Sequence, residues 1–401
     1  MENELIVFTV VVITLFYGFF SKLLEKFNIS GPMIFLLIGM ILSPLGFDFI
    51  VIALDSQGVE IVAEIALVIV LFSDSSSLNL KGFKTGWQMP TRLLFIGLPL
   101  TIIFSSYVAT LMFPNEPFLY LLVMALVLAP TDAALGKAVV TRRCVPRKIR
   151  SAINVESGLN DGIVFPILIT ALLLIVAHKE FGSDSSWGLY LLKQIALGVF
   201  VGTLSGFIGA KILNYVMKKK WVEDVYINLS PVSLAILIYF IAEYLGGNGF
   251  IAAFVGGASF GNFSTLLRGE RKVFLESEGE VLILISFLIF GLTFIPATYQ
   301  QWDLEVFAYA FMSLTFFRIF PVFISLIGIK IPFWSKMFIA WFGPRGIASI
   351  LYVMTVARSI ESADLHNKLF SVISLTILLS IILHGLSAKP LANLYAKKFK
   401  I

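Results

Sequence analysis

Residues 118–140 read FLYLLVMALVLAPTDAALGKAVV, an apolar run of membrane-spanning length with Pro130, Thr131 and Asp132 at its centre. Proline removes a backbone hydrogen-bond donor and disturbs the preceding helical turn. The pattern predicts a helix that breaks inside the span and resumes near Asp132. Unwound backbone at that depth is tolerated only where it lines a cavity or is buried in protein. A proline kink with Asp132 as N-cap of the second half-helix is the structural alternative, and it is compatible with ion binding.

The composition places this run in a polytopic membrane protein. The chain has 401 residues, of which 58% are hydrophobic and 14% charged, whereas soluble proteins are roughly 45–50% apolar and about 25% charged. A soluble enzyme, a disordered chain and, with Cys144 as the single cysteine, a disulfide scaffold are excluded. The basic residues form short clusters between apolar runs, so the net charge of +5 indicates topology signals and no nucleic-acid partner.

Apolar runs separated by polar breaks predict an all-α fold of about thirteen transmembrane helices. The first run follows Met-Glu-Asn-Glu, and the longest polar stretch is a short loop, so we expect no cleavable signal peptide and no soluble domain. The predicted spans are residues 4–21, 32–46, 58–73, 91–112, 118–140, 149–177, 189–216, 227–245, 247–265, 279–296, 303–328, 335–357 and 367–387.

The basic residues predict the orientation of the chain. Loops after the odd-numbered spans, together with the C-terminal end, hold 23 of the 30 Lys and Arg residues. The loops on the other side hold only Lys179, Lys193, Arg358 and Lys368. Because Lys and Arg accumulate on the cytoplasmic side, we expect the N-terminus outside and the C-terminus in the cytoplasm. Without visible targeting signals, a plasma (inner) membrane is the expected location.

The sixth span carries two acids in the sequence Asn154-Val155-Glu156-Ser157-Gly158-Leu159-Asn160-Asp161. Glu156 and Asn160 are four residues apart, as are Ser157 and Asp161, so a helix places all four on adjacent strips of one face. A charge at the bilayer centre costs about 2.5–3.5 kcal/mol on insertion scales and needs a partner, water or a function. Oxygen ligands of this kind suit a hard cation, or a proton in its place. Hydrogen-bonded packing between helices is the structural alternative.

The sequence Gly343-Pro344-Arg345-Gly346 predicts a second broken helix, in the twelfth span, with a permanently charged guanidinium at membrane depth. We predict a structural ion pair between Arg345 and Glu156, which leaves Asp161 as the titrating group. Asp132 is the competing partner for Arg345. Removing one member of such a pair leaves a buried unpaired charge, at a cost of about 3–5 kcal/mol.

Other polar groups in or near the spans are expected to have structural roles. They are Arg318 in the eleventh span, Glu64 and Asp74 in the third, Glu243 in the eighth, Lys137 in the fifth and His384 in the last. Lys137 can snorkel towards the cytoplasm, and His384 can titrate near neutral pH. The Gly-rich segments at 246–249 and 256–257 indicate close helix packing, and no Walker-type nucleotide sequence is visible.

The broken spans, five and twelve, occupy corresponding positions if residues 1–177 and 227–401 form inverted repeats joined by a linker helix at 189–216. Paired, proline-interrupted spans are typical of inverted-repeat transporters, whose substrate sits near the midplane. Like ends of the half-helices would then confront each other. We expect Asp132 to compensate the positive N-terminal ends and Arg345 to interact with the negative C-terminal ends.

These motifs resemble those of the monovalent cation:proton antiporter superfamily, specifically its electroneutral sodium/proton exchanger branch. The sequences PTDAALG, VESGLND and FGPRG carry the resemblance, in order and at the expected spans, and it covers essentially the whole chain. It implies the antiporter fold, in which two broken helices cross in a mobile six-helix core, and a homodimer surrounded by membrane lipids. One departure is Ala133, where many relatives have proline.

The resemblance also implies how an ion would be held. Asp161 would bind Na⁺ (or Li⁺ or K⁺) together with Glu156, Ser157 and the backbone carbonyl of Thr131, with Asn160 as an orienting group. Asp161 would then carry either a proton or a cation, so competition alone would couple the two fluxes. No ATP, redox cofactor or resident metal is needed, and an Asn-Asp pair is associated with electroneutral exchange.

Two alternatives come from other functional classes. A channel or uniporter could use the same acids, although the sequence has no filter-like repeat. A membrane-embedded hydrolase could use Ser157 and His384, which are predicted at different depths. The sequence therefore predicts a secondary active transporter, and not an enzyme.

Overall fold

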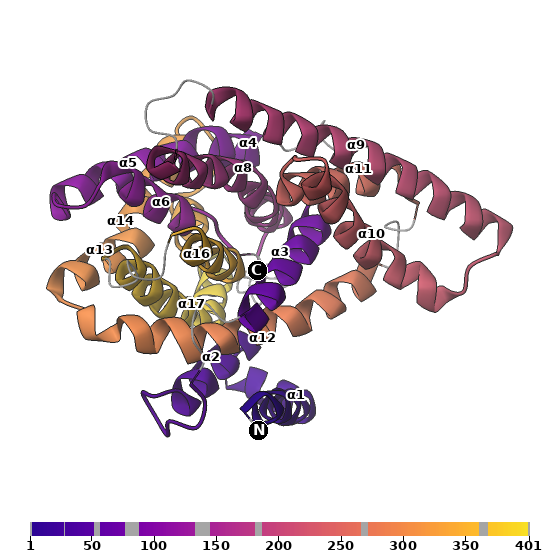
Figure 1. Cartoon of the computed structure of the whole chain (residues 1–401). Helices are drawn as coiled ribbons and strands as arrows, with labels where there is room; N and C mark the ends of the chain where they lie inside the picture. The colour runs from indigo at the N-terminus through magenta and orange to yellow at the C-terminus, as the bar shows by residue number, and fades with distance from the viewer. Residues whose placement is uncertain are drawn as a thin grey trace. The chain divides into compact units, whose positions relative to one another are not determined.

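The computed structural model describes residues 2–27, 29–51, 57–76, 88–132, 145–180, 187–265, 272–360 and 368–399. All regular structure within these ranges is helical (Figure 1). The helices are α1 (Glu2–Lys26), α2 (Gly31–Leu42), α3 (Gln57–Ser76), α4 (Gln88–Arg92), the π-helix η2 (Leu93–Gly97), α5 (Leu98–Met112), α6 (Phe118–Leu128), α8 (Arg147–Glu180), α9 (Trp187–Lys219), α10 (Asp224–Tyr244), α11 (Gly249–Phe263), α12 (Lys272–Thr298), the 3-10 helix η3 (Tyr299–Gln301), α13 (Leu304–Leu314), α14 (Phe316–Ser325), α15 (Phe333–Trp341), α16 (Ile347–Ser359) and α17 (Lys368–Phe399).

Helical membrane-protein architecture is confirmed. Seven helical stretches of the described chain are long and apolar enough to cross a membrane, and five shorter apolar helices accompany them. Each predicted span overlaps at least one helix. The count of thirteen spans stays a prediction, because the second half of the fifth span, including Ala133 and Lys137, lies outside the described residues.

The chain divides into two compact units, and α3, α8 and α12 each contribute to both. Unit 1 contains residues 1–60, 87–160 and 283–401, and unit 2 contains residues 61–86 and 161–282. The predicted inverted repeats of residues 1–177 and 227–401 stay a prediction.

Unit 1 is built around α17, which packs against α2, α6, α13 and α16. Figure 1 shows α16 and α17 side by side, next to α6 and α13. The centre of α17 is buried along most of its length. Glycines let α2 approach the C-terminal part of α12, since a Cβ on Gly39 would lie 2.4 Å from the Leu288 carbonyl oxygen. The middle of α17 lies beside the non-helical residues 342–346 described below, because Ser380 and His384 contact Arg345 and Trp341.

Unit 2 is built around the contact between α9 and α11, with α10 packed on both. Gly202 and Gly206 on α9 face the backbone of α11, where an added Cβ would lie 2.4 Å from the Ala252 oxygen and 2.2 Å from the Gly256 oxygen. The predicted close packing of the Gly-rich segment at 256–257 is confirmed. Asn248 begins α11 as an N-cap, since its Oδ1 accepts a hydrogen bond from the Ile251 N–H at 3.0 Å.

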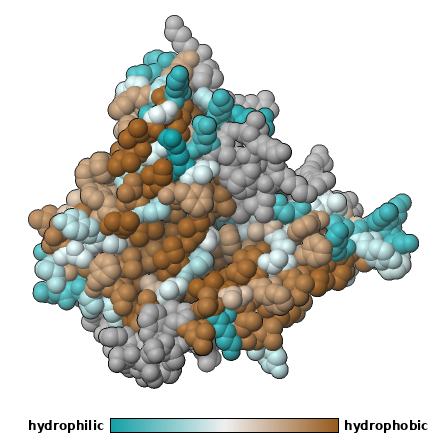
Figure 2. Space-filling model, turned by 90° about the horizontal axis from the view of Figure 1, so that it is seen from above, coloured by the Kyte–Doolittle hydropathy of each residue, from teal (hydrophilic) through white to brown (hydrophobic). Residues whose placement is uncertain are grey.

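The surface of the helices is largely hydrophobic. Figure 2 shows broad areas of hydrophobic side chains, with hydrophilic residues gathered at projecting ends. Several large apolar side chains are highly exposed, among them Phe19, Phe95, Leu189, Phe240 and Leu304. Exposed apolar surface on this scale is expected of helices that face lipid.

Candidate functional site

The end of α6 and the interruption between α15 and α16 meet inside unit 1. The helix α6 ends at Leu128, and Pro130, Thr131 and Asp132 continue without helical structure. The twelfth span is broken as predicted, with α15 and α16 separated by the non-helical residues 342–346. The two breaks contact each other directly, because the Asp132 N–H donates to the Pro344 carbonyl oxygen at 2.8 Å. Irregular backbone is therefore buried in protein at this point, as membrane depth requires.

Polar side chains satisfy the helix ends at this crossing. The Asp132 Oδ2 atom accepts a hydrogen bond of 2.9 Å from the N–H of Ile347, the first residue of α16. Ser349 Oγ donates to the Val127 carbonyl oxygen, in the last turn of α6, at 2.7 Å. An acid at a helix N-terminus is stabilised by the helix dipole. The prediction that Asp132 compensates a positive helix end is confirmed, and the helix it caps is α16.

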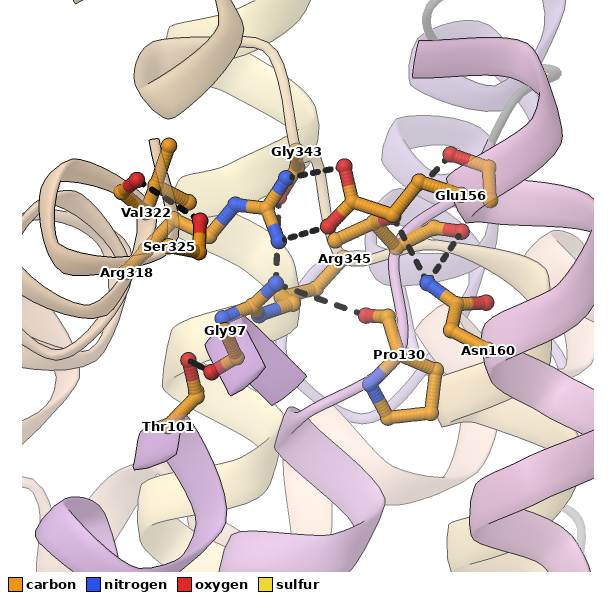
Figure 3. Close-up of polar contacts among 12 residues, drawn as sticks. Gly97, Thr101, Pro130, Glu156, Asn160, Arg318, Val322, Ser325, Gly343 and Arg345 are labelled. Carbon is orange, nitrogen blue, oxygen red and sulfur yellow. Dashed lines mark hydrogen bonds and ion pairs between the residues drawn. The ribbon is translucent and has the colours of Figure 1, made fainter. Parts of the chain in front are cut away.

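Arg345 lies among backbone carbonyl groups and is 1% exposed. Its Nη1 atom donates to the carbonyl oxygens of Gly343 at 3.2 Å and Pro130 at 3.4 Å, and its Nη2 atom donates to that of Ser313 at 3.5 Å. Figure 3 shows the guanidinium pointing towards Pro130. The Pro130 carbonyl follows the C-terminal end of α6, the Gly343 carbonyl follows that of α15, and Ser313 is in the last turn of α13. The expected interaction of Arg345 with negative helix ends is therefore confirmed.

The partner predicted for Glu156 was wrong. Its carboxylate is paired with Arg318 of α14, with Nη1–Oε1 at 2.5 Å and Nη2–Oε2 at 2.9 Å (Figure 3). Both side chains are buried. A guanidinium and a carboxylate that meet through two parallel hydrogen bonds form the strongest type of ion pair. Arg318 reaches Glu156 from the first turn of α14, whereas Arg345 is directed to carbonyl groups.

Gly343 has a specific steric role in this arrangement. A Cβ at this position would lie 2.5 Å from Arg318 Nε and 2.8 Å from Arg318 Cζ. Arg318 has little freedom to move away, because Glu156 holds its guanidinium at two points. The glycine of the predicted break therefore leaves room for the buried ion pair.

Three of the predicted site residues form one hydrogen-bonded cluster. Asn160 Nδ2 donates to Thr131 Oγ1 at 2.8 Å, and Thr131 Oγ1 lies 3.0 Å from Ser157 Oγ. The same amide nitrogen lies 3.5 Å from the Thr131 carbonyl oxygen. All three side chains are buried. The break after α6 and the polar face of α8 are thus joined by hydroxyl and amide groups.

Asn160 has a further property that bears on ligands. Its Oδ1 atom is buried and accepts no hydrogen bond from the described residues. A buried acceptor without a partner is costly unless water or a ligand satisfies it. The cluster therefore presents an unused oxygen from the residue that also orients Thr131.

Asp161 follows Asn160 on α8 and is 6% exposed. It lies four residues after Ser157, so the helix places both side chains on one face. A carboxylate on the lipid-facing side of a helix would be exposed, and this one is buried. The predicted acids Asp132, Glu156 and Asp161 are all buried, but the structure gives the first a capping role and the second an ion-pair role.

The other polar groups singled out in the sequence have separate surroundings. The Tyr239 hydroxyl of α10 donates to the Glu64 carboxylate of α3, and Glu243 accepts from the Gly249 N–H at 2.7 Å, at the start of α11. Both contacts lie in unit 2 and support the structural roles expected for these acids. Asp74, near the end of α3, is partly exposed. Lys137 lies outside the described residues.

The chain matches a family of known membrane proteins. Residues 10–394 match the profile described as "Sodium/hydrogen exchanger, transmembrane". The K(+)/H(+) antiporter NhaP2 of Shewanella sp. (strain ANA-3) is 27% identical over 380 residues, which cover 93% of this chain and 64% of that protein. A Na(+)/H(+) antiporter of Schizosaccharomyces pombe is 26% identical over 310 residues, covering 69% and 65%. The chain thus spans slightly less than two thirds of the length of these curated relatives.

Solved structures show the same fold. The sodium proton antiporter MjNhaP1 from Methanocaldococcus jannaschii at pH 8 superposes with a TM-score of 0.78 and 21% sequence identity, covering 96% of this chain and 100% of that one. A second structure of MjNhaP1 gives a TM-score of 0.74 and covers 98% of each chain. The match over residues 10–394 takes in both chain breaks and the polar face of α8. The chain therefore belongs to the sodium/hydrogen exchanger family.

Proposed function

We propose that this protein is a secondary active antiporter that exchanges a monovalent cation for protons. The observation that carries the proposal is the buried cluster that joins Thr131, in the non-helical residues after α6, to Ser157 and Asn160 of α8. The buried carboxylate of Asp161 is also on α8. Carboxylate, hydroxyl, amide and carbonyl oxygens are suitable ligands for Na⁺, Li⁺ or K⁺. Family membership and the names of the relatives, which include both K(+)/H(+) and Na(+)/H(+) antiporters, support the same class of substrate.

Each residue has a distinct part in this proposal. Asp161 holds either the cation or a proton, and Ser157 with the Thr131 carbonyl supplies neutral oxygen ligands. Asn160 orients Thr131 through its amide nitrogen and offers its unused Oδ1 to the site. Both carboxylate oxygens of Glu156 already accept hydrogen bonds from Arg318, so we assign Glu156 a mainly structural role.

Exchange follows from mutually exclusive occupancy. A cation that binds Asp161 requires the ionised carboxylate, and a proton that binds it removes the charge that attracts the cation. Alternating access to the two sides of the membrane then couples the two fluxes. If one cation replaces one proton, no net charge moves, and the rate of exchange does not depend on voltage. No cofactor takes part in these steps.

The proposal is tested by proton flux in proteoliposomes of the purified 401-residue chain. Na⁺, Li⁺ and K⁺ are added in turn to vesicles that hold a pH-sensitive dye, at external values of pH 5–9. We expect cation-dependent alkalinisation or acidification of the vesicle interior for at least one cation, and none with choline. The Ser157→Ala variant should require more cation for half-maximal flux. Absence of any cation-dependent proton flux in the wild type would contradict the proposal.

The same experiment separates the alternatives. A channel or uniporter would carry the cation down its gradient without a proton flux in the opposite direction. For a hydrolase, Ser157 and His384 would have to act together, but Ser157 bonds to Thr131, while the ring nitrogens of His384 contact Ser380 and the Trp341 carbonyl. The contacts of these two residues therefore give the hydrolase no support.

The proposed topology places the N-terminus outside and the C-terminus in the cytoplasm of a plasma membrane, in a homodimer. Cys144 is the single cysteine and falls in a predicted cytoplasmic loop, outside the described residues. A membrane-impermeant maleimide should label it in inverted vesicles and leave it unlabelled in intact right-side-out vesicles. The reverse pattern of labelling would contradict this orientation. Cross-linking in native membranes tests the homodimer.

A further inference from the structure

The helix α17 contacts the second chain break through three polar side chains, Ser380, His384 and Ser387, which we call the α17 bridge. Ser380 Oγ accepts a hydrogen bond of 2.6 Å from the backbone N–H of Arg345. His384 Nε2 lies 3.0 Å from the carbonyl oxygen of Trp341, the last residue of α15. Ser387 Oγ accepts from Trp341 Nε1 at 3.0 Å. One helix therefore binds both sides of the non-helical stretch.

The bonds of the α17 bridge form a continuous chain. Ser380 Oγ also lies 3.3 Å from His384 Nδ1, and that nitrogen is 3.0 Å from the Ser380 carbonyl oxygen. In a neutral imidazole with its proton on Nε2, Nε2–H donates to the Trp341 carbonyl and Nδ1 accepts from the Ser380 hydroxyl. The Ser380 oxygen then accepts the Arg345 N–H. Each donor of this tautomer meets one acceptor, while the unprotonated Nδ1 forms no hydrogen bond with the Ser380 carbonyl oxygen that lies 3.0 Å away.

Burial makes these contacts consequential. Ser380 is 0% and His384 2% exposed. The His384 ring also stacks on the Trp341 indole, with centroids 5.1 Å apart and planes at 29°. Chain breaks leave backbone groups without helical partners, and in a buried place each unmet donor or acceptor is costly. Ser380 and His384 therefore satisfy backbone groups on both sides of the non-helical stretch, at Arg345 and at Trp341.

We propose that Ser380 and His384 are positioning residues for exchange. They fix the backbone of Arg345 and the end of α15, and through Arg345 they fix the Pro130 carbonyl and the break that carries Thr131. They do not contact the proposed cation ligands, since the described polar contacts of both are to α15, Arg345 and α17 itself. This inference rests on the proposed function. It gives α17 the role of holding the non-helical residues beside the proposed cation site in position.

Because Ser380 and His384 lie outside the proposed cation ligands, their loss should affect turnover and cation affinity differently. Loss of the α17 bridge should loosen the break without removing a ligand, so the turnover rate should fall and the cation concentration for half-maximal flux should stay within about twofold. A change in ligation would have the opposite signature, with a raised half-saturation concentration. The loosening itself should appear as faster exchange of the Arg345 amide proton, whether or not the protein transports.

The test compares four variants with the wild type in lipid nanodiscs and in proteoliposomes. Ser380→Ala removes the acceptor for Arg345, and His384→Phe keeps a ring that can stack on Trp341 but removes both nitrogens. His384→Gln keeps a donor that can reach the Trp341 carbonyl. Thr376→Val is the matched control, because Thr376 is buried on the same helix and, among the described residues, its hydroxyl bonds only to the Val372 carbonyl of α17. Hydrogen–deuterium exchange is followed in peptides that contain residues 342–348.

We expect Ser380→Ala and His384→Phe to speed amide exchange in these peptides about tenfold and to lower turnover by a similar factor. His384→Gln should recover part of both values, and Thr376→Val should match the wild type. Amide exchange in Ser380→Ala and His384→Phe equal to that of Thr376→Val would overturn the proposal. So would a raised half-saturation concentration with unchanged turnover. Absence of transport by the wild type would instead count against the proposed function, and the amide measurement would still judge this inference.

Discussion

Glu156 and Arg318 place opposite full charges in the protein interior, 2.5 Å apart at the closest atoms. Burying two ions costs desolvation free energy, so an ion pair of this kind adds little to the free energy of unfolding compared with a well-packed apolar pair. Loss of one partner is nevertheless strongly destabilising, because it leaves the other charge buried and unpaired. The same reasoning applies to Asp132 and Arg345, whose charges are matched to helix ends. At the residue scale, the charges of Glu156, Arg318, Asp132 and Arg345 are therefore each matched by a defined partner.

The first prediction concerns that ion pair. Glu156→Gln should destabilise the protein by about 3–5 kcal/mol, because Arg318 would then be buried without a counter-charge. The double variant Glu156→Gln with Arg318→Gln should recover much of the loss. Thermal unfolding in detergent measures both. Additive losses in the double variant would show that the two side chains do not depend on each other.

A second prediction concerns pH at the end of α13. Asp303 is the N-cap of that helix and accepts a hydrogen bond from Lys368, and this bond is the main cause that lowers the pKa of the Asp303 carboxyl below its ordinary value of 3.8. Folding therefore favours the ionised form, and its contribution is complete above the ordinary value and is lost as the pH falls below it.

Asp303→Asn tests this, since asparagine can still cap the helix. The melting temperature of the variant should be slightly lower than that of the wild type at pH 7. The two should converge as the pH falls below 3.8. The effect should be small, because exposed ion pairs contribute little. A difference that grows with acid would be incompatible with a lowered pKa.

Among the secondary-structure elements, α9 and α11 show how glycine sets helix contact. The backbones approach so closely at Gly202 and Gly206 that a side chain has no room. Such contacts are common between membrane helices, where small residues allow close van der Waals packing.

The third prediction follows from this packing. Gly206→Ala should destabilise the protein by roughly 1–3 kcal/mol through overpacking, although alanine is the better helix former by about 1 kcal/mol. Gly18→Ala is the control, since a Cβ there meets nothing within 4 Å. Melting temperatures in the same detergent provide the comparison. Equal or higher stability of Gly206→Ala would contradict the observed helix contact.

The elements also show what a sequence can predict. The end of α6 is marked by Pro130, and the interruption between α15 and α16 is marked by Pro344 with Gly343 and Gly346, all of which act on the local backbone. The polar face of α8 follows from helical spacing. The interruption between α13 and α14, at Thr315, was not predicted, because no proline or glycine stands at that position and Pro321 lies inside α14.

Long-range partners are a different matter. Arg318 and Arg345 are both arginines within apolar spans, and the choice between them for Glu156 depends on how the helices are rotated about their axes. Spacing along one chain does not contain that rotation. The signal available was Arg318 itself, whose charge in the apolar segment Phe-Phe-Arg-Ile-Phe-Pro made it a second candidate partner for a buried acid. The contact of His384 with Trp341 depends on tertiary packing in the same way.

For the whole molecule, we predict electroneutral exchange. Flux through wild-type protein in proteoliposomes should be unchanged, within experimental scatter, when the membrane potential is clamped at zero or at about 100 mV with a potassium gradient and valinomycin, with Na⁺ or Li⁺ as the exchanged ion. Movement of one net charge per cycle would be driven by about 2.3 kcal/mol at that potential. A rate that rises or falls with voltage would rule out one-for-one exchange.

The central claim is that a proton and a cation compete for Asp161. Proton release on cation binding measures it most directly: NaCl, LiCl, KCl or choline chloride is added to purified protein in weakly buffered detergent solution. The wild type should release about one proton for each cation bound, and choline should release none. Asp161→Asn, if folded as judged by its melting curve, should release none with any salt. Proton release by Asp161→Asn equal to that of the wild type would contradict the account.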